Sequence, residues 1–134
     1  MRVKSIWQEK YKSIVDNGRD HKITMDLPYL QDGTDSGATA LEVAVMGYAG
    51  CITTIYAMMA EKLKVSFTEM TCHLEAEKGV KTIEKIIIKL DITSDSDENK
   101  LRKAFEMTCK NCPVGVIFEQ AGIKVDTEIN ITKA

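Results

Sequence analysis

The sequence predicts an α+β fold, on three features of its hydropathy pattern. Short segments of alternating apolar and polar residues open the chain, one long apolar segment follows, and strand-like and helix-like segments complete it. Strands and helices grouped in this way are typical of α+β proteins. The 134 residues suffice for one hydrophobic core, so we expect a single domain over residues 1–134.

The N-terminal third is expected to form strands joined by turns. Apolar and polar residues alternate over 3–8 and 12–15, and a further strand is expected over 21–27. The Asp-Asn-Gly sequence at 16–18 indicates a hairpin, because Asn-Gly tolerates positive φ at both turn positions. The stretch 30–38 is rich in Gly, Asp, Ser and Thr and is expected to be a loop.

A long apolar helix is expected next. Thr39 and Glu42 have the spacing of a capping box, with Thr39 as the N-cap. The helix should run to about Lys64, and it is apolar nearly all round over 43–60. Glu42, two glycines and two tyrosines favour a buried helix over a membrane span. One small sheet cannot cover such a helix, so we expect a dimer that shares its central helices.

The second half is expected to begin with two strands, over 67–78 and 82–93, and to end with a strand over 123–131. Acidic and hydroxyl residues at 94–97 should cap the helix that follows the second strand. The alternation in that strand predicts two faces, with Ile86, Ile88, Leu90 and Ile92 on one and Ile83 and Ile87 on the other.

Pro113 is expected to divide the last helical segment in two. The helix before it carries one apolar stripe, made of Leu101, Ala104, Phe105, Thr108 and Cys109. Pro113 cannot donate a backbone hydrogen bond and forces Cys112 out of helical geometry. A new helix should begin at Pro113 and end near Gly122. Cys112 would then be its N-cap, where free N–H groups would lower the pKa of the thiol.

The composition excludes some classes of function. The net charge of −2 gives no basic field, so no nucleic-acid partner is expected. The N-terminus lacks the apolar run of a signal peptide, and a cytoplasmic location is expected. In that location the four cysteines favour redox catalysis, metal binding or packing over a disulfide framework.

Each cysteine has a plain structural explanation beside a chemical one. Cys51 is either a packed residue of the apolar helix or a nucleophile, and Cys112 is either part of a helix break or an activated thiol. Cys109 and Cys112 form a CxxC, which fits a redox pair, half a zinc site or coincidence; coincidence is favoured, with Cys109 as packing. Cys72 should pack in the core, with His73 on the other face.

Two charged residues are further candidates. Arg19 is either a solvated charge or the cation that holds a thiolate ionised or orients a peroxide. Glu42 is explained by helix capping, and nine residues along a straight helix would put it on the face opposite Cys51. An apolar pocket beside the cysteines, or simply the core, would use Met46, Met58, Met59 and Phe118.

Two segments resemble motifs of the OsmC/Ohr superfamily. Residues 41–51 read Leu-Glu-Val-Ala-Val-Met-Gly-Tyr-Ala-Gly-Cys and are similar to its first-cysteine motif: an acidic position, an apolar helix, small residues and a cysteine. The Cys-Pro-Val sequence at 112–114 is similar to its second motif. The two cysteines lie 112 − 51 = 61 residues apart, and the order of the expected elements matches from end to end.

This resemblance implies an OsmC/Ohr-like intertwined homodimer, with two central helices packed against β-sheets. It also implies thiol-dependent reduction of organic hydroperoxides in oxidative-stress defence. Cys51 would be oxidised to a sulfenic acid, and Cys112 would resolve it as a disulfide. An external dithiol, a lipoyl protein or another thiol, would reset the pair. No metal or organic cofactor is implied.

The sequence departs from the hydroperoxide-resistance branch of that superfamily in two places. Leu41 stands where that branch has an active-site glutamate, one position before Glu42. Gly-Arg-Asp at 18–20 is similar to its arginine-bearing segment, but His21 replaces a glycine. Glu42, beside the position of that glutamate, and Arg19, in the similar segment, are the candidate charged site residues. The alternatives to a peroxidase are a thiol carrier or small-ligand-binding protein without turnover, and a structural dimer.

Overall fold

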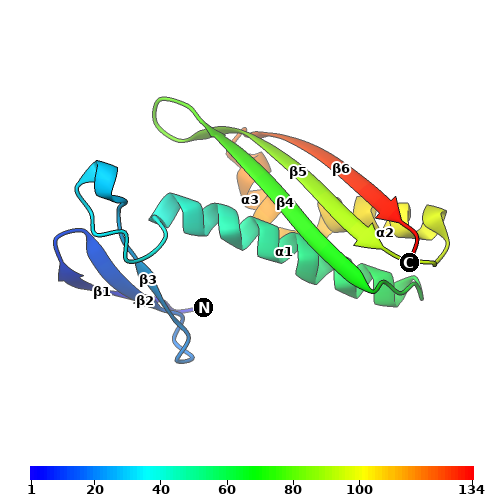
Figure 1. Ribbon diagram of the computed structural model, residues 1–134, viewed down its shortest axis with the longest axis horizontal. Coiled ribbons are helices and arrows are strands. Elements are labelled where there is room, and N and C mark those ends of the chain that lie inside the picture. Colours follow the sequence, from blue (N-terminus) through cyan, green and yellow to red (C-terminus); the bar gives the residue numbers. More distant parts are fainter. The chain divides into compact units, whose positions relative to one another are not determined.

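The computed structural model describes all residues, 1–134, and confirms the α+β class. The chain forms two compact units, Met1–Ala44 and Val45–Ala134. Each unit contains one three-stranded sheet (Figure 1). The long helix α1, Ala40–Lys62, begins in the first unit and continues through the second. The expectation of a single domain stays a prediction.

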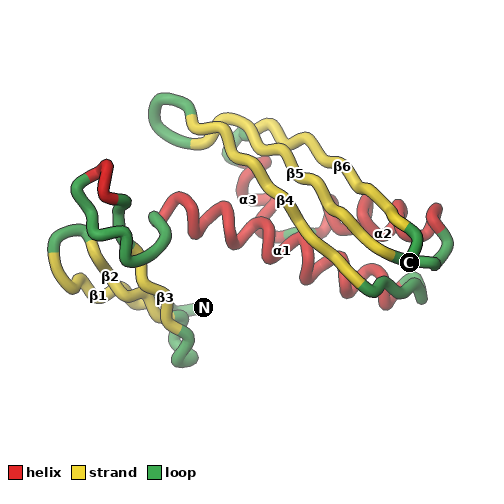
Figure 2. The backbone as a smooth tube through the Cα atoms, viewed as in Figure 1, coloured by secondary structure: helices red, strands yellow, loops and turns green.

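The N-terminal unit contains the strands β1 (Lys4–Glu9), β2 (Lys12–Asp16) and β3 (Lys22–Met25). They pair antiparallel in the order β1-β2-β3, as successive hairpins do. A single turn of 3-10 helix, Tyr29–Gln31, interrupts the loop that was expected after β3 (Figure 2). The strands are close to their expected positions.

The hairpin between β2 and β3 is confirmed, but its turn is longer than two residues. Asp16 pairs with Lys22 across it, which leaves five residues in the loop. Gly18 has a φ of 79°, whereas Asn17 does not take positive φ, so that part of the prediction is wrong. Asn17 acts instead through its side chain, whose oxygen accepts hydrogen bonds from the backbone N–H groups of Arg19 and His21.

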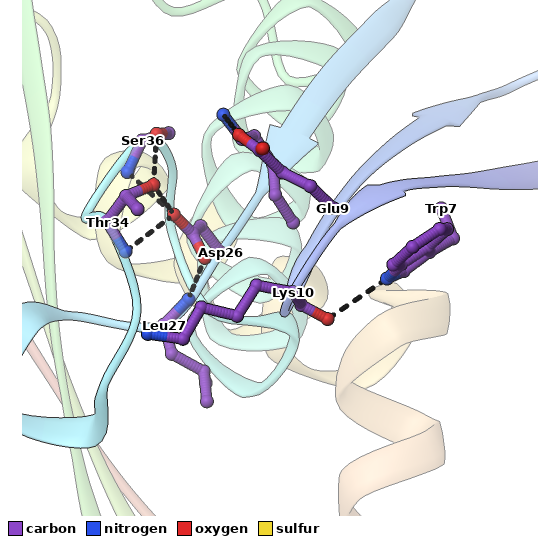
Figure 3. A network of polar contacts seen from close by, with 8 residues as sticks. Trp7, Glu9, Lys10, Asp26, Leu27, Thr34 and Ser36 are labelled. Atoms are coloured by element: carbon purple, nitrogen blue, oxygen red, sulfur yellow. Dashed lines mark hydrogen bonds and ion pairs between the residues drawn. The ribbon is translucent and has the colours of Figure 1, made fainter.

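A buried carboxylate organises the loop after β3. Asp26 is only 3% exposed, and its oxygens accept hydrogen bonds from the Thr34 hydroxyl (2.6 Å) and from three backbone N–H groups, those of Leu27, Thr34 and Ser36 (Figure 3). The Thr34 hydroxyl holds the pKa of Asp26 well below its usual range; burial opposes this effect, and the backbone donors add to it. Asp26 therefore stays ionised and keeps the loop closed.

The start of α1 is the capping box that the sequence predicts. The Thr39 backbone N–H donates to Glu42 Oε2 (2.8 Å), and the Glu42 N–H donates to Thr39 Oγ1 (3.1 Å). Two N–H groups without helical partners are thereby satisfied.

The C-terminal unit is built on the strands β4 (Glu69–Lys78), β5 (Ile83–Thr93) and β6 (Lys124–Thr132). β4 and β5 form an antiparallel hairpin, and β6 pairs parallel to β5. A parallel neighbour requires a crossover connection, and the helices α2 (Glu98–Asn111) and α3 (Pro113–Gln120) supply it. Asp97 caps α2 by accepting a hydrogen bond from the Lys100 N–H (2.9 Å).

The predicted faces of β5 are confirmed except at Ile83, which is buried on the same face as Ile86, Ile88, Leu90 and Ile92. The reason is a β-bulge. Lys78 pairs with Ile83 and Glu77 pairs with Lys85, so Glu84 is an extra residue that reverses the alternation. A bulge cannot be recognised in a regular apolar pattern.

The core of this unit lies where α1, α2 and the sheet meet. It contains Ile52 and Tyr56 of α1, Leu101 and Ala104 of α2, and the apolar face of β5. The helices cover one face of the sheet (Figure 1). The buried stripe of α2 includes Thr108, whose hydroxyl donates to the Ala104 carbonyl (2.7 Å).

Within one chain α1 is buried on one side only, which agrees with the expectation that one small sheet cannot cover it. Its buried residues, Tyr48, Ile52, Tyr56 and Ala60, follow each other at intervals of four and form one narrow stripe. By length and composition α1 could cross a membrane, since an 18-residue window of it has a mean hydropathy of 1.6. Only 22% of that window is buried. Most of this apolar helix has no cover within the chain.

We predict that Asp26→Asn lowers the melting temperature at neutral pH, because an amide cannot replace both accepting oxygens. The folded pKa of Asp26 lies below its unfolded value of 3.8, so its stabilising effect is present above pH 3.8 and is lost as the pH falls below it. Thermal melts between pH 7 and pH 2 should show a smaller loss on acidification in the variant than in the wild type. Asp35→Asn is the control, since the Asp35 side chain accepts no hydrogen bond; equal melts for all three proteins would contradict the prediction.

Candidate functional site

The helix α1 positions Cys51 near its middle, among small and apolar residues. Cys51 is half-buried and packs against the core, and its thiol is free. It lies one residue before the buried Ile52, at the edge of the buried stripe. A thiol at this edge is packed on one side and open on the other.

The break between α2 and α3 positions Cys112. With φ −70° and ψ 109°, this residue is at once the C-cap of α2 and the N-cap of α3. Its backbone N–H still donates to the Thr108 carbonyl, and its Sγ accepts a hydrogen bond from the Gly115 N–H (3.3 Å). The prediction that Pro113 begins a new helix capped by Cys112 is therefore confirmed, and the thiol is fully buried.

The structure brings these two cysteines together. Cys112 Sγ donates to Cys51 Sγ, with 2.8 Å between the two sulfur atoms, although the residues lie 61 positions apart. Both thiols are free. Two free thiols in contact can be oxidised to a disulfide with little movement of the backbone. The pair is thus chemically suited to a two-electron redox reaction.

The prediction that the helix end lowers the pKa of Cys112 is wrong for the reduced pair. Burial, together with the hydrogen bond to Cys51, raises the pKa of Cys112 to about 11, and the N–H groups of Gly115 and Val114 only partly oppose this. Desolvation of a thiolate outweighs the positive end of a short helix. Cys112 therefore keeps its proton and offers it to Cys51.

The other two cysteines lie at the margin of the core. Burial raises the pKa of Cys72 to about 11 and also raises that of Cys109, against the opposing effect of the Thr127 hydroxyl. Both side chains pack against the core, as the packing interpretation of the CxxC predicts for Cys109. His73 points away from the core and lies 3.3 Å from Asp91.

One residue of the site was missed by the sequence analysis. Tyr48 lies three positions before Cys51, on the same side of α1, and is 3% exposed. Its ring packs against Phe118 of α3, with 5.1 Å between the centroids. The spacing of three residues from a candidate nucleophile was the available signal, but a tyrosine in an apolar helix first suggests core packing.

The two charged candidates lie in the N-terminal unit. Arg19 is in the exposed turn between β2 and β3, and its guanidinium group makes no ion pair. Glu42 caps α1 with its carboxylate, which supports its structural explanation. Their catalytic roles stay predictions.

The expected pocket residues divide into two groups. Met59 and Phe118 are partly buried against the core, whereas Met46 and Met58 are 59% and 54% exposed on α1. Groups of three or more metal-ligating side chains are not found.

Comparison with known proteins identifies one matching family model and several proteins of similar fold. The family model for the OsmC-like protein matches residues 33–128. The OsmC-like protein of Mycoplasma pneumoniae has 15% identity and a TM-score of 0.87, over 98% of this chain and 96% of that one. A search of curated proteins found no match.

Two further similar structures are those of organic hydroperoxide resistance proteins. The one from Legionella pneumophila has 14% identity and a TM-score of 0.70, over 96% of this chain and 95% of that one. The one from Elizabethkingia anophelis has 14% identity and a TM-score of 0.77, over 98% and 97%. At these identities the similarity establishes the fold.

We predict that Cys112 resists alkylation in the reduced protein. With a pKa of about 11 rather than 9.0, its thiolate fraction at pH 8 is lower by roughly a hundredfold than that of an ordinary thiol. Labelling with iodoacetamide, followed by peptide mass analysis, should show a Cys112 rate that is low at pH 8 and still rises roughly tenfold per pH unit above it. A rate for Cys112 that has already reached its plateau at pH 8 would contradict this, and urea-unfolded protein serves as the control.

Proposed function

The chain belongs to the OsmC-like protein family, and on that basis we propose that it is a thiol-dependent peroxidase that reduces organic hydroperoxides in oxidative-stress defence. The observation that carries the proposal is the contact of Cys51 Sγ with Cys112 Sγ at 2.8 Å. A peroxidase of this kind needs one thiol that attacks and a second thiol within reach to remove the product.

The environments of the two thiols support Cys51 as the attacking one. Cys112 is fully buried, holds its proton, and donates a hydrogen bond. Cys51 is partly exposed and accepts that bond. Because Cys51 is the more exposed sulfur and Cys112 is sealed and protonated, Cys51 is the better placed of the two to meet a peroxide.

In the first step, the Cys51 thiolate attacks the terminal oxygen of the hydroperoxide. An S–O bond forms, the O–O bond breaks, and the alkoxide that leaves gains a proton to become the alcohol. The sulfur is oxidised by two electrons to a sulfenic acid, and the peroxide is reduced to the alcohol.

In the second step, Cys112 resolves the sulfenic acid. Its sulfur attacks Cys51 Sγ, a disulfide forms, and the hydroxyl group leaves as water with the Cys112 proton. An external dithiol, from a lipoyl protein or another thiol of the cytoplasm, then reduces the disulfide by thiol–disulfide exchange. All redox equivalents come from the peroxide and the dithiol, so the chemistry requires no metal or organic cofactor.

The surroundings of the thiols favour an organic peroxide over hydrogen peroxide. The aromatic rings of Tyr48 and Phe118 lie beside this part of α1 and α3, and Val45 and Val114 pack nearby against the same core. Apolar neighbours bind the alkyl or aryl group of a hydroperoxide through the hydrophobic effect and offer little to hydrogen peroxide.

We predict that Cys51→Ser abolishes hydroperoxide consumption, because the attacking sulfur is lost. Cys112→Ser should consume one equivalent and stop at the sulfenic acid, which a dimedone adduct would reveal by mass. The turnover assay compares cumene hydroperoxide with hydrogen peroxide in the presence of a dithiol. The single turnover of Cys112→Ser is measured without the dithiol, because a free thiol would reduce the sulfenic acid.

Cys72→Ser is the matched control for these variants and should retain full turnover. Sustained turnover by Cys51→Ser would overturn the assignment of the nucleophile. If the wild type consumes no hydroperoxide, a thiol carrier or ligand-binding protein without turnover replaces the peroxidase as the proposed function.

We also propose that the protein acts as a homodimer in which α1 packs against its copy. The exposed side of α1 carries Gly47, Gly50 and Ala57 between Met46 and Met58. A Cβ atom added at either glycine would meet nothing within 4 Å, so the surface there is open. Small residues between longer apolar ones allow two helices to approach closely, and such pairing would cover a helix that one chain leaves exposed.

We predict that Gly47→Leu converts the dimer to a monomer, because the leucine fills the space that a second helix would use. Within one chain the substitution should be tolerated, since it replaces a helix-destabilising residue and meets no neighbour. Light scattering after size exclusion would give the mass, and Lys103→Leu on the exposed face of α2 is the control. A monomeric wild type, or a dimeric Gly47→Leu variant, would contradict the proposal.

A further inference from the structure

The side chain of Tyr48 brings a hydroxyl group to the thiol pair. Burial raises the pKa of this phenol above its usual range, and the nearby Cys112, the Glu119 carboxylate and the other thiols add to the effect. The phenol therefore stays protonated at any physiological pH. It is available as a hydrogen-bond donor beside two sulfur atoms.

The position of the hydroxyl follows from its contact with α3. A Cβ atom added at Gly115 would lie 2.9 Å from Tyr48 Oη and 3.2 Å from the ring carbon that bears it. Gly115 is also the residue whose N–H donates to Cys112 Sγ. The phenol oxygen and the Cys112 sulfur thus lie against the same residue in the first turn of α3.

The Tyr48 hydroxyl has no hydrogen-bond partner in the protein. Every polar side-chain atom that is buried away from solvent has a hydrogen-bond partner. Because the Tyr48 hydroxyl has none, its oxygen belongs to the small part of Tyr48 that is exposed. Tyr56, two turns further along α1, is different: it is fully buried, and its hydroxyl donates to the Leu101 carbonyl (3.3 Å). Tyr48 has an unused donor where Tyr56 has a structural one.

We propose that Tyr48 is a catalytic residue that donates its phenolic proton to the alkoxide oxygen leaving the hydroperoxide. This inference rests on the proposed peroxidase function. The Cys51 thiolate takes the terminal peroxide oxygen, the O–O bond breaks, and the alkoxide takes the Tyr48 proton to leave as the alcohol. The tyrosinate then regains a proton from water.

The chemistry explains why a donor is needed at this place. An alkoxide is a strongly basic leaving group, and a positioned acid that protonates it lowers the barrier to O–O cleavage. A phenol with a raised pKa remains more acidic than an aliphatic alcohol, so the transfer is downhill. Neither thiol can do this, because Cys51 is being oxidised and the Cys112 proton is needed to release water in the second step.

The test is the single-turnover rate of Cys51 oxidation in wild type and Tyr48→Phe with two oxidants. Cumene hydroperoxide releases an alkoxide, which needs a proton, whereas peracetic acid releases acetate, which does not. We expect Tyr48→Phe to react roughly a hundredfold more slowly with cumene hydroperoxide and at the wild-type rate with peracetic acid. Phenylalanine keeps the ring packing on Phe118, and a thermal melt checks the fold.

Tyr56→Phe is the control and should react with both oxidants as the wild type does. An equal loss of rate with both oxidants in Tyr48→Phe would assign Tyr48 a packing role and overturn the proposal, as would the absence of any loss. A wild type that reacts with neither oxidant would overturn the peroxidase function itself, and the tyrosine's role with it.

Discussion

The site depends on one backbone constraint, the inability of Pro113 to continue a helix. Because Pro113 has no N–H group and restricts the residue before it, Cys112 leaves helical geometry between α2 and α3. That single residue then ends one helix, caps the next through its own sulfur, and holds the sulfur against Cys51. If α2 continued as a regular helix, the Cys112 side chain would point in a different direction.

The same constraint gives the two sulfur atoms different environments. The residue at the helix break is buried and protonated, while the residue on α1 is half-buried and accepts its hydrogen bond. A helix end is usually taken as a place where a thiol becomes acidic. Here the loss of solvation has the larger effect on the pKa of Cys112. The helix end therefore serves to position the Cys112 sulfur, and the hydrogen bond between the two thiols makes one the donor and the other the acceptor.

Much of the fold could be predicted from local signals. Thr39 with Glu42, Asp97 and Pro113 each mark a helix boundary through one side chain, and all three boundaries occur where expected. Each depends on contacts within a few residues, which a sequence displays directly. The two cysteines of the site were identified for the same reason and by their resemblance to known motifs, which had implied that they form a pair.

The features that could not be predicted arise from tertiary packing. The apolar pattern of β5 does not indicate that Glu84 is the extra residue of a β-bulge, which places Ile83 on the buried face. The raised pKa of Cys112 results from burial, and the place of Tyr48 results from its contact with α3. Finally, the 60 residues between Cys51 and Cys112 contain β4, β5 and α2, so a disulfide would tie most of the C-terminal unit into one covalent ring. By chain entropy alone such a ring adds roughly 4 kcal/mol against unfolding, and the oxidised protein would therefore outlast its reduced form under proteolysis.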